Sequence, residues 1–110
     1  PFVELVSLAD ANKGKKVFSK CKSCHKIEEK INGTGPHLYG IVGRPIASID
    51  NYTYSNILVE MKDRVWNEDE LNGFLTKPSK YAPGTKMSYS GLSAEKDRAN
   101  LVAYLKTFYE

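Results

Sequence analysis

The stretch Cys21-Lys22-Ser23-Cys24-His25 decides how this chain is interpreted. It holds both cysteines of the 110-residue sequence and, directly after the second, one of its two histidines. Residues at positions i, i+3 and i+4 lie on the same face of a helical turn. The spacing therefore predicts two thiols and one imidazole side by side.

Covalent haem attachment is the chemistry that this arrangement fits best. The two thiols can add to the two vinyl groups along one edge of a haem, and His25 can then bind the iron through a ring nitrogen. The C-x-x-C-H pattern thus predicts haem held by Cys21 and Cys24, with His25 as an iron ligand.

Three other roles for the motif stay open, although each is disfavoured. A thioredoxin-like pair needs a βαβ context, which the sequence does not show. A structural zinc site needs four ligands, which Cys21, Cys24, His25 and His37 could supply, but the adjacent Cys24 and His25 would bind one tetrahedral ion awkwardly. A disulfide would be strained at a three-residue spacing on a helix.

Length and composition indicate one globular domain. The chain is 41% hydrophobic and 26% charged, which excludes disordered, collagen-like and coiled-coil proteins. No apolar run reaches the ~20 residues of a membrane span. The net charge of +3 is too small to indicate nucleic-acid binding.

Apolar periodicity and capping residues predict an all-α fold with three to five helices. Asn67 and Glu70 have the spacing of a capping box. The helical segments expected are the stretch from Asp10 or Asn12 through Phe18 to the cysteines, Asn56–Lys62, the stretch from Asn67 to Pro78, and the stretch after Ser93 with Leu101, Val102, Leu105 and Phe108 on one face.

Two long loops, 32–54 and Lys77–Met87, are expected between these helices because both are rich in Gly and Pro. Long loops in so small a domain are expected to wrap a bound group, and a haem would supply apolar core. Residues 10–110 are predicted to form the haem domain. Residues 1–9, with the apolar start Pro1–Leu8, suit equally an arm packed on that domain or a linker remnant.

A closed electron-transfer centre needs a second iron ligand, and Met87, Met61 and His37 are the candidates. Met87 ends a Pro/Gly turn that begins at Tyr81 and can present a side chain inward. Met61 lies in an expected helix and is predicted to be core. His37 follows His25 so closely that reaching the opposite face would need a very short wrap.

Further motifs resemble those of the class I c-type cytochromes, of the mitochondrial and alphaproteobacterial type. They extend from about Asn12 to Leu105. The motifs are Gly14-Lys-Lys-Val-Phe18, Cys21–His25, Gly35-Pro-His-Leu-Tyr-Gly40 with Gly43-Arg44, Tyr52-Thr-Tyr54-Ser55, Trp66, Tyr81–Met87 and Leu101-Val-Ala-Tyr104-Leu105.

This resemblance implies a class I cytochrome c fold around one covalent haem c, with His25 and Met87 as the two iron ligands. It implies that the Pro36 carbonyl accepts the imidazole N–H of His25, which fixes the ring. Four further residues resemble those that hold or approach the haem propionates: Arg44, Tyr54, Trp66 and Thr85. Gly14 and Phe18 resemble the crossing of the first and last helices.

The chain departs from the family pattern at two positions. His37 stands where many members have Asn, in a Gly-Pro-His-Leu variant similar to that of bacterial membrane-anchored cytochromes c. The start of the chain would suit the linker of such a protein, with an anchor before residue 1. Phe74 stands where mitochondrial proteins have a Tyr, so a hydroxyl near the Met ligand is missing.

The resemblance implies a one-electron carrier and not an enzyme. Its donor would resemble the quinol–cytochrome c reductase complex and its acceptor a terminal oxidase. A haem peroxidase would need a vacant iron position, which Met87 opposes, and a gas sensor would need a labile Met–iron bond. Because haem is attached outside the cytosol, the resemblance implies the periplasm, and a monomer is expected.

The lysines of this chain gather on the segments that flank the expected haem. Glu60, Asp63, Glu68, Asp69 and Glu70 are clustered elsewhere. The lysines concerned are Lys13, Lys15, Lys16, Lys20, Lys22, Lys26, Lys77, Lys80 and Lys86. Such an asymmetry favours docking to acidic surfaces of redox partners over a lysine face kept only for solubility.

Overall fold

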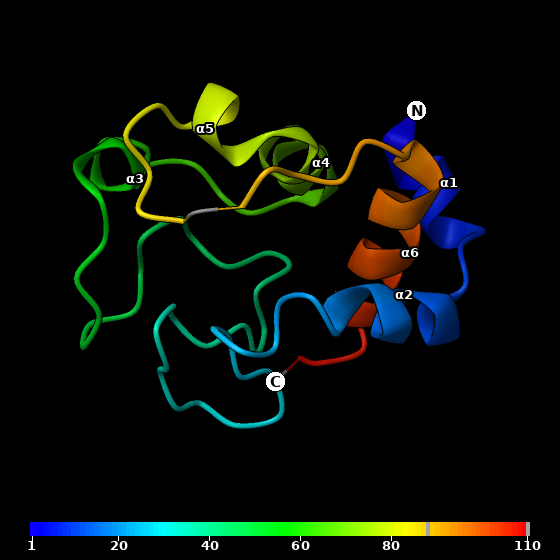
Figure 1. Ribbon diagram of the computed structural model, residues 1–110, viewed down its shortest axis with the longest axis horizontal. Helices are drawn as coiled ribbons and strands as arrows, with labels where there is room; N and C mark the ends of the chain where they lie inside the picture. Colours follow the sequence, from blue (N-terminus) through cyan, green and yellow to red (C-terminus); the bar gives the residue numbers. More distant parts are fainter. Residues whose placement is uncertain (88, 110) are drawn as a thin grey trace.

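The computed structural model describes residues 1–87 and 89–109. Within them the regular structure is helical, apart from one isolated antiparallel bridge between Pro45 and Val65, and the predicted all-α class is confirmed. Six helical segments are present where three to five were expected: α1 Phe2–Ser7, α2 Ala11–Phe18, α3 Asn56–Glu60, α4 Glu68–Thr76, α5 Pro78–Tyr81 and α6 Glu95–Leu105. Figure 1 shows α1, α2 and α6 grouped at one end of the molecule, with residues 19–55 running mostly as loops.

The crossing of α2 and α6 is the largest contact between helices (Figure 1). Asp10 caps α2, because its carboxylate accepts the backbone N–H groups of Asn12 and Lys13 at 2.8 and 3.3 Å. A Cβ on Gly14 would lie 1.9 Å from the backbone oxygen of Asn100, so only glycine allows the two backbones this approach. The family-derived expectation for Gly14 is therefore met.

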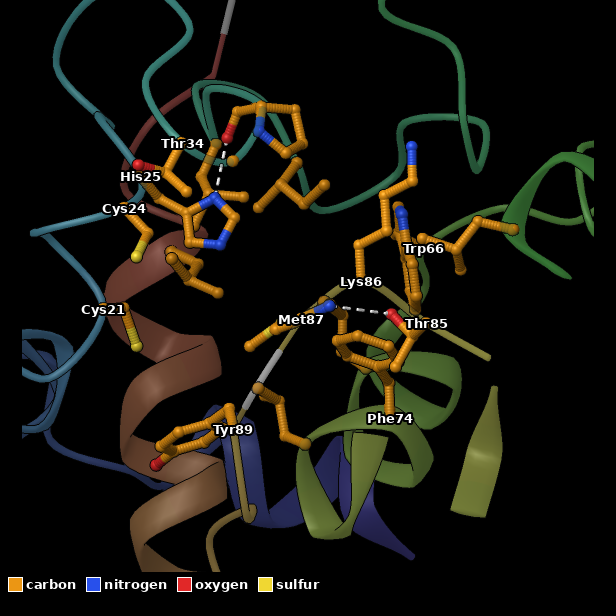
Figure 2. Close-up of a pocket in the computed structure, with 18 of the residues that line it drawn as sticks. Cys21, Cys24, His25, Thr34, Trp66, Phe74, Thr85, Lys86, Met87 and Tyr89 are labelled. Carbon is orange, nitrogen blue, oxygen red and sulfur yellow. Dashed lines mark hydrogen bonds between the residues drawn. The ribbon is translucent and has the colours of Figure 1, made fainter. Parts of the chain in front are cut away.

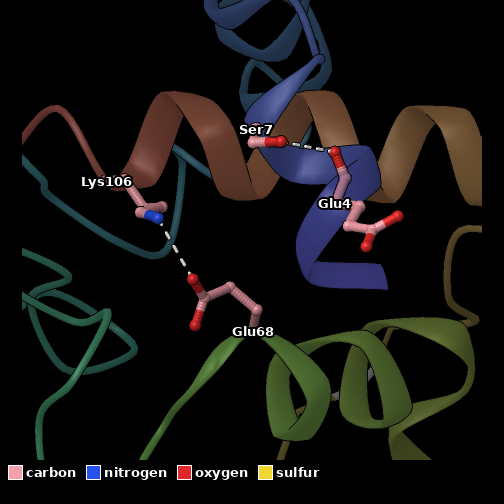
Figure 3. Close-up of polar contacts among 4 residues, drawn as sticks. All are labelled: Glu4, Ser7, Glu68 and Lys106. Atoms are coloured by element: carbon pink, nitrogen blue, oxygen red, sulfur yellow. Dashed lines mark hydrogen bonds and ion pairs between the residues drawn. The ribbon is translucent and has the colours of Figure 1, made fainter. Parts of the chain in front are cut away.

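The helix α4 begins as the sequence predicts. The Asn67 side chain accepts the N–H of Glu70 at 2.8 Å. Glu68 in its first turn also reaches Lys106, just after α6, at 3.0 Å (Figure 3). Pro78 does follow the end of α4, but it also begins the single turn α5, within a segment that was expected to be irregular throughout. Proline fits there because the first helical position needs no N–H donor.

The N-terminal segment forms a helix, α1, which packs against α4 and α6. Phe2 and Val6 are buried in the core, whereas Leu8 is 85% exposed. Within α1, the hydroxyl of Ser7 donates to the carbonyl of Glu4 at 2.7 Å (Figure 3). In the described part of the chain, none of the helices has the length and apolar character needed to cross a membrane.

Candidate functional site: a cavity behind the Cys-x-x-Cys-His turn

A cavity of about 470 Å³ lies between the cysteine turn, the loops and helices α4 and α6 (Figure 2). Apolar side chains from several elements form much of its wall, including Leu71, Phe74 and Leu101. All nine residues predicted for the site line it: Cys21, Cys24, His25, Pro36, Arg44, Tyr54, Trp66, Thr85 and Met87. Residues separated by more than sixty positions in sequence thus meet at one site.

Cys21 and Cys24 lie on a tight turn that follows α2, which ends at Phe18 and does not extend to the cysteines as the sequence predicted. The N–H groups of Cys24 and His25 both donate to the carbonyl of Cys21, at 3.1 and 3.0 Å. This turn brings the two side chains to the same side of the cavity (Figure 2). Neither of these two cysteines is in a disulfide, and burial raises the pKa of Cys21 above its usual value.

A hydrogen bond to the backbone of Pro36 holds the His25 ring in a defined orientation. Its Nδ1–H donates to the carbonyl of Pro36 at 2.7 Å, and this fixes the tautomer so that Nε2 keeps its lone pair. Burial, and to a lesser degree the charge of Arg44, lowers the pKa of His25 below its usual value, although the bond to Pro36 opposes this shift. A neutral imidazole with a free Nε2 is the form that binds a metal.

Gly35 makes room for this imidazole. A Cβ on Gly35 would lie 2.4 Å from Cε1 and 2.8 Å from Nδ1 of His25, so the glycine backbone packs directly against the ring. The Gly35-Pro36 pair therefore supplies both the space for the ring and the acceptor that orients it.

Of the three candidates for a second ligand, Met87 alone lines the cavity in the described part of the chain. Its side chain extends into the cavity, and its backbone N–H donates to the hydroxyl of Thr85 at 3.4 Å (Figure 2). Met61 is partly buried against the hydrophobic core, as the sequence predicts, although α3 ends at Glu60 and Met61 lies just beyond the helix. His37 is buried with its backbone carbonyl bound by Arg44 at 2.9 Å.

At the polar end of the cavity, two buried polar atoms have no hydrogen-bond partner within the described part of the protein. Nε of Arg44 and the hydroxyl of Ser55 are buried without a hydrogen-bond partner. Burial lowers the pKa of Arg44, yet the guanidinium remains a strong donor at neutral pH. Because buried polar groups are normally satisfied, this end fits a bound group that carries acceptor oxygens. The propionates of a haem are such acceptors.

Tyr54 and Trp66 complete this end of the cavity. The Tyr54 hydroxyl accepts the N–H of Ile49 at 3.2 Å, which leaves its own proton free to donate. The backbone N–H of Trp66 donates to the carbonyl of Arg44 at 2.9 Å and so ties the two residues together. The Trp66 ring lies edge-on to Phe74, with ring centroids 5.3 Å apart.

Sequence reasoning missed Ser55 as a site residue. Ser55 belongs to the Tyr52–Ser55 motif, but from the sequence alone it resembles an ordinary polar loop residue. Its burial and its unpartnered oxygen identify it only in the fold. Tyr52, whose hydroxyl donates to the carbonyl of Thr34 at 3.0 Å, is a second cavity residue without an assigned role.

The zinc alternative finds no support in the geometry. Among the described residues there is no group of three or more His, Cys, Asp or Glu side chains placed to hold a metal ion. His37, which would have to be the fourth ligand, is not among the residues that line the cavity.

Comparison with known proteins agrees with the geometry. The family model described as "Cytochrome c" matches residues 11–108. A cytochrome c homolog of Rickettsia conorii is 45% identical over 106 residues, which is 96% of this chain and 60% of the relative. The cytochrome c of Euglena viridis is 46% identical over 99 residues, or 89% of this chain and 96% of the relative.

A solved structure is similar over nearly the whole domain. Cytochrome cH from Methylobacterium extorquens superposes with a TM-score of 0.83 at 40% identity, covering 90% of this chain and 99% of that chain. The chain spans 60% of the length of the Rickettsia relative. The match to the family model, the identity to these relatives and the shared fold together show that the chain belongs to the cytochrome c family.

Proposed function

We propose that this chain is a one-electron carrier and not an enzyme. It holds one haem c through thioethers to Cys21 and Cys24, with His25 and Met87 as the iron ligands. When bound, the haem iron supplies a reversible one-electron change between Fe(III) and Fe(II). The family to which the chain belongs and the cavity lined by these four residues support the proposal.

One observation carries the proposal. The imidazole of His25 is fixed by Pro36 with Nε2 free, and Met87 reaches the same cavity from a distant loop. If haem is bound, the imidazole of His25 and the thioether of Met87 would both bind its iron, and this would leave no position for a substrate. The thioether favours the reduced state and raises the potential, which suits electron transfer.

The remaining site residues shield and neutralise the bound group. Arg44, Tyr54 and Ser55 are proposed to donate to its acid side chains, joined by Trp66, and the Thr85 hydroxyl retains a proton that it can donate. The apolar wall formed by residues such as Leu71 and Leu101 excludes water. A closely packed wall of this kind limits how far the protein atoms around the haem move when the charge of the iron changes.

The proposed partners are acidic proteins of a respiratory chain: a donor of the quinol–cytochrome c reductase type and a terminal oxidase as acceptor. Lys20 and Lys86 belong to different lysine-rich segments, yet both line the cavity. Their positions support docking to acidic partners. Among the described residues that line it, none is acidic. The carrier is proposed to work as a monomer in the periplasm.

The test is optical. Purified holoprotein is expected to show a c-type haem spectrum with the weak far-red band of Met–Fe(III). Met87→Ala is expected to abolish that band, whereas Met61→Ala and His37→Ala leave it in place, because neither side chain lines the cavity. A far-red band that persists in Met87→Ala would overturn the ligand assignment.

A further inference from the structure

Arg98, in α6, is a buried cation whose partners lie in two other parts of the chain. It is 8% exposed. Its Nε donates to the side-chain oxygen of Asn72 in α4 at 2.7 Å, and its Nη1 donates to the carbonyls of Leu92 and Ser93 at 2.7 and 3.0 Å. The guanidinium that donates these three bonds is charged, so each bond is charge-assisted and stronger than one between two neutral groups.

The carbonyls that Arg98 binds belong to the segment that leaves the cavity after Met87. Tyr89, two residues after Met87, lines the cavity wall (Figure 2). Leu92 is buried, and its N–H donates to the carbonyl of Leu75 at the end of α4 at 2.8 Å. The segment is therefore fastened to α4 through a backbone bond and to α6 through Arg98.

Gly91 shows how closely this segment is pressed against α4. Its φ of +105° belongs to the region that favours glycine, and a Cβ there would lie 2.2 Å from the backbone oxygen of Thr76. There is therefore no space for a side chain at residue 91, between this segment and the end of α4. The position of the segment is thus defined by packing as well as by hydrogen bonds.

We propose that Arg98, oriented by Asn72, is a positioning residue that clamps the downstream end of the Met87 segment and so sets how rarely Met87 leaves the cavity. The inference rests on the proposed function, because it assumes that Met87 is the iron ligand. The bond from the Leu92 N–H to the Leu75 carbonyl does not involve Arg98. Without the clamp we therefore expect this segment to stay folded and Met87 to leave the cavity more often.

Competition by imidazole measures this departure. Imidazole added to the oxidised holoprotein replaces Met87 only in molecules in which Met87 has left, so its apparent affinity scales with that fraction. Arg98→Lys keeps the positive charge but loses the planar guanidinium, which donates at the same time to α4 and to residues 92–93. We expect this variant to bind imidazole at least about ten-fold more tightly, as the loss of one charge-assisted hydrogen bond predicts.

Asn72 gives a second and independent variant, because Asn72 is only half-buried. Asn72→Ala is expected to raise the imidazole affinity in the same direction, whereas Asn72→Asp keeps an acceptor for Nε and restores the wild-type value. This rescue separates positioning from packing. A lack of difference between Asn72→Ala and Asn72→Asp would contradict the role of the Asn72–Arg98 bond.

Val102→Ala is the matched control for general destabilisation. Val102 is in α6 and fully buried, but it does not line the cavity. Its truncation is expected to lower the free energy of unfolding and to leave the imidazole affinity within about two-fold of the wild type. The proposal is overturned if Arg98→Lys binds imidazole like the wild type, or if Val102→Ala raises the affinity as much. Failure of the ligand assignment is detected separately, by the far-red band of Met87→Ala.

Discussion

At the scale of single residues, Gly35 shows how a missing side chain orients a ligand. Its backbone occupies the space beside His25 that a Cβ would fill. Gly35→Ala is expected to push the ring from its position and to lower the free energy of unfolding of the holoprotein by about 1–3 kcal/mol. Guanidinium unfolding measures this change.

Glu29, which is exposed and does not line the cavity, provides the control. Glu29→Ala is expected to change the free energy of unfolding by less than about 0.5 kcal/mol. Equal losses in the two variants would show that the space beside the ring is unimportant.

His37 makes stability depend on pH. Burial, and then the charges of Arg44 and Lys30, hold the pKa of His37 below its usual 6.5. The native state therefore favours the neutral ring, while the unfolded chain takes up a proton near pH 6.5. The stabilising contribution of His37 to the free energy of unfolding is therefore complete above pH 6.5, and it is lost as the pH falls from 6.5 toward the lower pKa of the native state.

We therefore expect the free energy of unfolding to fall between pH 7 and pH 5 by more in the wild type than in His37→Asn. Guanidinium midpoints at the two pH values measure the difference. All other ionisable groups are common to both proteins, so their contributions cancel in the comparison. If the free energy of unfolding falls equally in the wild type and in His37→Asn, then His37 has the same pKa in the folded and the unfolded chain.

Local residue patterns were predictable, whereas roles that depend on distant partners were not. The caps at Asp10 and Asn67 could be read directly, because a cap bonds to its immediate neighbours. Arg98 could not, since its acceptors come from residues 72, 92 and 93 and only the fold brings them together. The Cys21–His25 spacing predicted two thiols and one imidazole side by side, and all three line one cavity because a single turn holds them.

At the scale of elements, the crossing of α2 and α6 depends on one position. A Cβ on Gly14 would meet the Asn100 oxygen at 1.9 Å and the Tyr104 Cβ at 2.8 Å. Because backbone cannot move aside as a flexible side chain can, Gly14→Ala is expected to cost about 3 kcal/mol or more. Lys15→Ala, at the next, exposed position of α2, is the control.

Thermal unfolding of the two variants distinguishes packing from helix propensity. Alanine favours helix over glycine by about 1 kcal/mol, so an isolated helix would gain from Gly14→Ala. A stabilised Gly14→Ala protein would therefore show that the two helices do not pack as closely as described.

Long periodic helices were predicted better than short ones. The α6 pattern was clear because Leu101, Val102 and Leu105 bury one face, and all three are in the core. The six residues of α1 offer too little periodicity, and their helix is supported by Phe2 and Val6 packing on α4 and α6. Tertiary contact, and not propensity, determines such short helices.

At the scale of the whole molecule, charge placement is expected to govern encounters. Lys20→Glu and Lys86→Glu each change a lysine at the cavity. Both are expected to slow oxidation of the reduced protein by a terminal oxidase about five-fold or more at low salt, and to flatten the salt dependence. Stopped-flow kinetics over a range of ionic strength measures this.

Lys96→Glu is the matched control. Lys96 lies beside Leu5 and Leu8 of the N-terminal segment and does not line the cavity. The same change of net charge there is expected to have little effect on the rate. If all three variants slow the reaction equally, net charge and not a docking surface controls it.

The meeting of α2 with α6 also has a consequence for cooperativity. The amide of Asp10 donates to the side chain of Asn100 at 2.9 Å, across 90 residues of intervening chain. Closing so large a loop costs about 4 kcal/mol of chain entropy. Helices of 8 and 11 residues are too short to persist alone in water. Neither helix is stable before the other has formed, so α2 and α6 are expected to form and to melt together.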